Sequence, residues 1–135
     1  MAIEWFVYAY EKGEEQYIPT PMIMSALSPH LKKNEHGFDL MLPDGPVAVY
    51  SDWSASQTSG VMIARPLRCD VLLDVVYKVM QCGNFILFSS DGGIPIVIDI
   101  NVLDELPDDM LESLKPPRLA EDFTAFAQAI NEMYR

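Results

Sequence analysis

Few residues in this chain have the types and spacing that chemistry requires, and the two histidines are the first candidates. His30 and His36 lie six residues apart, and neither has a cysteine nearby. A zinc site needs further ligands at suitable spacing. We therefore expect both histidines to be solvated or structural, and the sequence predicts no metal and no cofactor.

Two short motifs share residues with catalytic or phosphate-binding signatures but lack the rest of them. Asp91-Gly92-Gly93 has no flanking glycines, lysine or following helix of a phosphate-binding loop, so a hairpin turn is expected there. Ser89 and Ser90 lack the Gly-x-Ser-x-Gly context of a nucleophile. Asp99 and the carboxylates after it could bind a metal or act as acid and base, but the calcium-loop pattern is absent. The sequence therefore favours a protein that is not an enzyme.

The strongest functional feature is an acidic segment in the second half of the chain, where no base occurs between Lys78 and Lys115. Clustered carboxylates can attract a basic protein surface, in an association that is fast and sensitive to salt. An exposed, solvated face without a partner is the alternative interpretation. The acids of this acidic segment are Asp104, Glu105, Asp108, Asp109 and Glu112.

The charge of the whole chain points in the same direction. Its 20 acidic and 9 basic side chains give a net charge of −11. Residues 1–68 hold eight acids and five bases, whereas residues 69–135 hold twelve acids and four bases. Such a surface repels nucleic acid and anionic membranes and attracts basic partners. Solubility alone is the alternative explanation.

Aromatic residues that could complete an interface lie in the first half of the chain. Tyr50, Trp53 and the small polar loop 54–60 are the candidates, because Trp and Tyr dominate the hot spots of protein interfaces. A core position for Trp53 is the alternative.

The cysteines and the N-terminal residues bear on the cellular compartment. Cys69 and Cys82, placed on one helix, would lie about 19 Å apart, which is too far for a disulfide. Reduced cysteines fit the cytoplasm. The first residues lack the basic and apolar regions of a signal peptide, and no apolar run reaches the length of a membrane span. We expect a cytoplasmic protein without membrane contact.

The scaffold that must position these residues is centred on the stretch 69–100. Its first part, 69–82, is apolar except at Asp70, Asp74, Lys78 and Gln81, and this spacing predicts a mostly buried helix with one narrow polar stripe. Gly83 is predicted to end the helix in the left-handed conformation. A core strand over 85–88, a turn and a returning strand over 94–100 should follow, and proline in the returning strand places it at or beside a sheet edge.

The flanking regions supply further strands and helices. Bulky residues on both faces of 3–10 predict a central strand that is covered on both sides. Strands are also expected over 37–42, 47–53 and 61–65, and the final helix over 119–134. Short helices should start after a Thr20-Pro21 cap and at Pro107. The expected fully buried core residues are Leu73, Val76, Phe85, Leu87 and Phe126.

Together these elements predict a single α+β domain over residues 1–135. Its sheet should be antiparallel or mixed and packed against two main helices, 69–82 and 119–134. No internal repeat or second domain is evident.

The order of several short motifs resembles small bacterial immunity proteins, which neutralise a cognate toxin delivered by a neighbouring cell. The resembling pieces are Trp5-Phe6-Val7-Tyr8, the Leu42-Pro43-Asp44-Gly45 turn, Arg65-Pro66 before an apolar helix, Leu106-Pro107-Asp108-Asp109-Met110, and Lys115-Pro116-Pro117. The resemblance implies a cytoplasmic, non-catalytic binder that blocks a toxin domain, frequently a nuclease. It transfers no site residue, because immunity proteins have many unrelated folds.

The expected function is therefore that of an immunity protein, a stoichiometric inhibitor of a cognate toxin with a basic surface. An acidic scaffold or regulatory module with an endogenous protein partner is the alternative, and a small enzyme is the third. The expected partner-binding residues are the acidic segment together with Tyr50 and Trp53.

Overall fold

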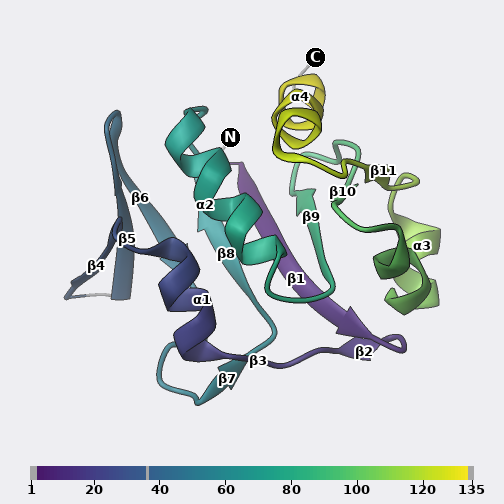
Figure 1. Cartoon of the computed structure of the whole chain (residues 1–135), viewed down its shortest axis with the longest axis horizontal. Coiled ribbons are helices and arrows are strands. Elements are labelled where there is room, and N and C mark those ends of the chain that lie inside the picture. Colours follow the sequence, from purple (N-terminus) through teal and green to yellow (C-terminus); the bar gives the residue numbers. More distant parts are fainter. Residues whose placement is uncertain (1–2, 36, 134–135) are drawn as a thin grey trace.

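The computed structural model describes residues 3–35 and 37–133, so His36 and Tyr134 lie outside the described residues. The fold contains one large sheet, one small sheet and several helices (Figure 1). The large sheet is built from β1 (Glu4–Glu11), β2 (Glu14–Glu15), β4 (Leu31–Asn34), β5 (Gly37–Leu42), β6 (Gly45–Tyr50), β8 (Gly60–Ala64), β9 (Phe85–Ser89), β10 (Ile96–Val97) and β11 (Arg118–Leu119). The small sheet pairs β3 (Ile18–Pro19) with β7 (Gln57–Thr58). The helices are α1 (Thr20–Leu27), α2 (Asp70–Met80), α3 (Asp108–Ser113), α4 (Phe123–Met133) and the 3-10 helix η1 (Ile100–Glu105).

The large sheet is mixed, with the strand order β11-β10-β9-β1-β8-β6-β5-β4 and β2 paired to β1. β10 and β11 are parallel, and β1 runs antiparallel to both of its long neighbours, β8 and β9. The central position predicted for the first strand is therefore confirmed. The predicted α+β class is also confirmed, with α2 and α4 as the two longest helices at 11 residues each.

The two faces of β1 differ in their surroundings. Trp5, Val7 and Ala9 are fully buried on what we call the inner face of the sheet. Phe6 and Tyr8 point to the opposite, outer face and remain half-buried. The expectation that both faces of this strand are covered therefore holds for the inner face and only in part for the outer one. Helices cover only part of the outer face, and the bulky side chains there shield one another from solvent.

Helices α1, α2 and α4 cover the inner face, and α1 and α2 lie next to each other across the sheet (Figure 1). Their apolar residues share one core with the inner residues of β1, β5, β6, β8 and β9. The predicted core is confirmed, since its members are between 0% and 5% exposed. These residues are Leu73, Val76, Phe85, Leu87 and Phe126.

Helix α2 has the polar stripe that its spacing predicts. Asp70, Asp74, Lys78 and Gln81 are exposed, while most residues between them are buried. Asp74 and Lys78 form an ion pair of 3.0 Å between successive turns. The acid-first order of this pair is the favourable one on a helix.

The predicted role of Gly83 is wrong. Its φ lies outside the left-handed region, and α2 ends earlier, at Met80 with Gln81 as the cap residue. A Cβ at position 83 would lie 2.6 Å from both Gln16 Oε1 and Ile18 Cδ1. Glycine at this position therefore allows the chain before α1 to approach the end of α2 closely.

The outer face is covered on one side by η1 and α3. Ile86 and Val97 of the sheet form a second, smaller core with Val102 and Leu106, and Met110 of α3 packs against it. The returning strand predicted over 94–100 is accordingly too long, because only β10 pairs with β9 before the chain enters η1. β10 lies beside the edge strand β11, as the proline before it predicts.

Several local features differ from the sequence-based expectations. Thr20 does not cap α1; it lies within the helix, is buried, and donates a hydrogen bond to the Ala55 carbonyl at 2.7 Å. The strand predicted over 47–53 ends at Tyr50. β4, β11 and η1 were not predicted, because such short elements carry little periodic signal.

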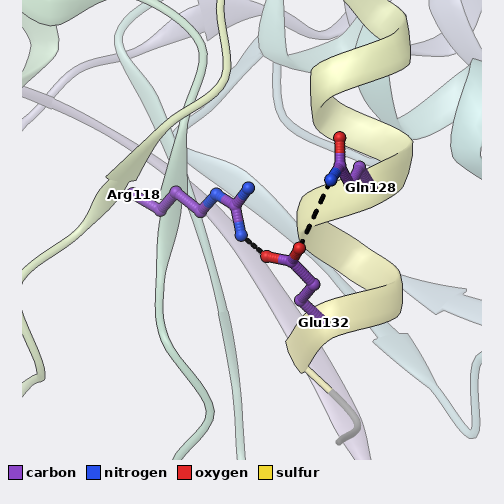
Figure 2. A network of polar contacts seen from close by, with 3 residues as sticks. All are labelled: Arg118, Gln128 and Glu132. Atoms are coloured by element: carbon purple, nitrogen blue, oxygen red, sulfur yellow. Dashed lines mark hydrogen bonds and ion pairs between the residues drawn. The ribbon is translucent and has the colours of Figure 1, made fainter.

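The last helix begins later than predicted, at Phe123, because the preceding residues form β11. The Asp122 carboxylate accepts a hydrogen bond from the Ala125 N–H at 2.8 Å, which satisfies a free donor at the start of the helix. Figure 2 shows how Arg118 on β11 forms an ion pair with Glu132 near the end of α4, while Gln128 donates to the same carboxylate at 3.4 Å. These contacts join the C-terminal helix to the edge of the sheet.

Candidate functional site

The acidic segment lies on η1 and α3, on the outer side of the sheet. Asp104 stands near the end of η1, and Asp108, Asp109 and Glu112 lie on α3. All four are exposed. Within residues 3–35 and 37–133, none of these four carboxylates forms an ion pair with a lysine or arginine. The segment therefore presents a cluster of unpaired carboxylates to solvent, and Lys12 lines the same hollow as Asp104, Asp108 and Asp109.

Glu105 differs from the other members of the segment. Its carboxylate accepts a hydrogen bond from the backbone N–H of Lys12 at 2.6 Å, and its carbonyl accepts one from Gly13 at 3.0 Å. Lys12 has a φ of 51°, which is uncommon for a residue other than glycine. In the free protein, Glu105 thus positions the turn between β1 and β2.

Tyr50 and Trp53 are not brought together on one surface. Tyr50 is 51% exposed on the outer face. Trp53 is half-buried and packs against the Phe38 ring at 5.1 Å, at the margin of the inner core. Its Nε1 is buried and has no hydrogen-bond partner among the described residues. The core interpretation of Trp53 therefore matches its contacts.

The outer face carries apolar side chains that sequence reasoning did not select. Phe6 on β1 pairs with Phe88 on β9 and with Met62 on β8, and Met62 pairs with Tyr50 on β6. Directly paired residues point to the same face of a sheet. Phe88, Phe6, Met62 and Tyr50 therefore form one line across four strands, which we call the aromatic row. The signals for it in the sequence are Tyr50, which is an interface candidate by residue type, and the bulky second face of β1.

The rings of the aromatic row hold one another in place. Phe6 and Phe88 stack at 5.1 Å between ring centroids, and Tyr8 meets Phe88 edge-on at 5.9 Å. Phe88 also packs against the smaller core beneath η1. The row thus starts at the covered side of the outer face and continues onto its open side.

Acidic groups stand near both sides of the aromatic row. Glu4 and Asp39 line a shallow hollow of about 540 Å³ together with Tyr50, Met62 and Arg65. On the other side, η1 and α3 carry the acidic segment. The outer face therefore combines apolar rings with acidic groups on both sides, and Arg65 and Lys32 stand beside the acids on the open side.

The tyrosines of β1 respond to this environment. The pKa of Tyr10 is raised above the ordinary value of 10.0, first by burial and then by Tyr8, Glu15 and Asp109. The pKa of Tyr8 is raised by burial and by Glu15. Both hydroxyls therefore stay protonated and remain hydrogen-bond donors beyond the usual pH range of tyrosine.

These tyrosines predict a loss of stability at alkaline pH. When a group has a higher pKa in the folded state than in the unfolded state, its contribution to stability is fully present below the unfolded-state pKa. This contribution is lost as the pH rises through the folded-state pKa. Above pH 10.0, we expect the free energy of unfolding of Tyr10→Phe to fall less steeply with pH than that of the wild type. Urea unfolding on both sides of that pH measures the difference, and equal slopes would contradict the expectation.

The described residues give no structural sign of a metal site. Among them, no group of three or more His, Cys, Asp or Glu side chains is arranged to hold a metal ion.

Cys69 and Cys82 are both free thiols, and burial raises the pKa of the Cys82 thiol. No helix in the described part of the chain has the length and apolar character needed to cross a membrane.

The arrangement defines an α+β protein whose mixed sheet has helices on its inner face and a partly open, aromatic outer face beside an acidic helical segment. Searches of protein-family models, of curated proteins and of solved structures found no match to this chain.

Proposed function

We propose that this protein is a non-catalytic binder of a basic protein partner, and that it acts in the cytoplasm as an immunity protein that blocks a cognate toxin domain. The exposed carboxylates of η1 and α3 carry the proposal, because four of them are clustered and none of the four forms an ion pair with a lysine or arginine among the described residues. The resemblance to immunity proteins supplies the toxin as the partner. A nuclease domain suits this role, since a surface that holds nucleic acid is basic.

The mechanism of binding is electrostatic capture followed by contact. Like charges that cluster in the free protein repel one another, and a cationic partner relieves this repulsion. Charge complementarity of this kind mainly raises the association rate. An acidic scaffold with an endogenous partner would use the same surface, so toxin protection is what distinguishes the two functions.

The test is co-expression with the product of the adjacent gene, followed by binding kinetics at low and high salt. We expect the triple variant Asp104→Asn, Asp108→Asn and Asp109→Asn to fold normally and to associate about tenfold more slowly at low salt. The wild type should also lose most of this advantage at high salt.

A control variant separates local charge from total charge. The control removes an equal number of negative charges, three, from exposed positions outside η1 and α3, through Asp44→Asn, Asp70→Asn and Glu121→Gln. This control should associate nearly as fast as the wild type. If the η1–α3 variant binds and protects cells as well as the control does, the acids are only a solvated face. Binding without protection from a toxin would favour the endogenous-partner function.

A further inference from the structure

The open part of the outer face is the largest feature that the acidic segment does not explain. Within residues 3–35 and 37–133, η1 and α3 cover the outer side of β9 and β10, and no helix packs over the outer residues of β8 and β6. Tyr50 and Met41 are 51% and 44% exposed there. An apolar sheet face that is left open beside polar residues is typical of an interaction surface.

We propose that the aromatic row is the central contact surface for the basic partner, and that an arginine-bearing segment of that partner lies across β9, β1, β8 and β6. This inference rests on the proposed function and deepens it by assigning the surface and its chemistry. At a strand spacing of about 4.8 Å, the row spans about 14 Å, which suits a short extended or helical segment.

The composition and rigidity of the row fit an interface centre. Aromatic residues and methionine are enriched where protein interfaces become fully buried. The ring contacts among Phe6, Tyr8 and Phe88 hold these side chains before binding. Binding then costs little further side-chain entropy.

The charges around the row select a cationic occupant. Glu4 and Asp39 line the hollow beside Tyr50 together with Arg65, and Lys32 stands opposite Asp39 on β4. Glu15 lines a second hollow with Tyr8, whose ring meets Phe88, and the acidic segment lies beyond Phe88. Over the whole length of the row, the acids therefore outnumber the bases. An arginine can stack its guanidinium plane on an aromatic ring while it pairs with a nearby carboxylate. A second copy of this chain would instead bring the same acids together across a two-fold axis.

The first test maps the contact with a defined probe. The intact protein, labelled at methionine methyl groups and phenylalanine rings, is titrated with a synthetic arginine-rich peptide and followed by nuclear magnetic resonance. We expect the Met62 and Phe6 signals to shift, and a lysine-rich peptide of equal length to shift them less, because its ammonium groups stack more weakly. Shifts confined to η1 and α3 would show that the aromatic row is not the contact surface, and they would leave the proposed function standing. A peptide that shifts neither region overturns both.

Substitutions at exposed positions complete the test without disturbing the core. Tyr50→Ala should weaken peptide affinity about fivefold, and Tyr50→Phe should keep it, because the ring supplies the contact. Ile94→Ala is the control, since Ile94 is 47% exposed outside the row, and it should change nothing. Equal losses in Tyr50→Ala and Ile94→Ala would contradict the proposal. A concentration-dependent dimer that Tyr50→Ala abolishes would assign the row to a second copy of the chain instead.

Discussion

Gly60→Ala is expected to lower the free energy of unfolding by about 3 kcal/mol or more, because the added methyl group has no space. A Cβ at position 60 would lie 2.3 Å from the Val7 carbonyl oxygen, 2.4 Å from Tyr8 Cδ1 and 2.9 Å from Tyr8 Cα. Two of these atoms belong to the backbone of the central strand. They cannot move away without disturbing the ladder in which Tyr8 pairs with Gly60.

The surroundings of Gly60 also prevent β8 from moving instead. Its carbonyl accepts hydrogen bonds from Ser51 Oγ at 2.6 Å and from Thr58 Oγ1 at 3.2 Å. A shift of the strand would weaken both bonds and leave buried polar groups without partners. The structure around position 60 therefore cannot relax to accommodate the added methyl group without a substantial cost in free energy.

Gly92→Ala provides the control for Gly60→Ala. Gly92 has a φ of +82° and no atom within 4 Å of an added Cβ, so alanine there meets backbone strain without a clash. That strain costs about 1–2 kcal/mol. Urea unfolding of both variants separates the two effects. A loss at Gly60 no greater than the loss at Gly92 would show that β1 and β8 do not approach as closely as described.

Elements with a strong local pattern could be predicted from the sequence, and α2 is the clearest of them. Its polar positions recur every three or four residues, so the pattern alone determines which side of the helix faces solvent. The two-residue strand β11 is the opposite case. It exists only because the chain returns to pair with a neighbour, and no period can reveal it.

Contacts between distant residues could not be predicted in the same way. The Glu105 carboxylate meets the Lys12 N–H across 93 positions of sequence, so its positioning role was hidden within an acidic segment. Gly83 was assigned to a helix end because local rules favour glycine there, whereas its environment is set by Gln16 and Ile18. Local rules describe the chain near a residue, and these roles come from the fold.

The candidate site shows the same division. The acidic segment is contiguous in sequence, so its exposed charge was predictable from composition. The aromatic row depends on the register between β9, β1, β8 and β6, which brings Phe88, Phe6, Met62 and Tyr50 together from remote positions. The bulky residues on both faces of β1 were visible in the sequence. Which face the helices cover could be decided only once the packing was known.

Leu73→Ala is the second prediction with a large effect, and we expect it to lower the free energy of unfolding by about 2–5 kcal/mol. Leu73 is 5% exposed on α2 and belongs to the core that this helix shares with the inner face of the sheet. Leu111→Ala is the matched control, because it makes the same substitution at a leucine that is 42% exposed on α3. The control should change stability by about 0.5 kcal/mol or less. Equal small losses at both positions in denaturant unfolding would mean that α2 does not pack on the sheet through this side, and the assignment of the inner face would have to be abandoned.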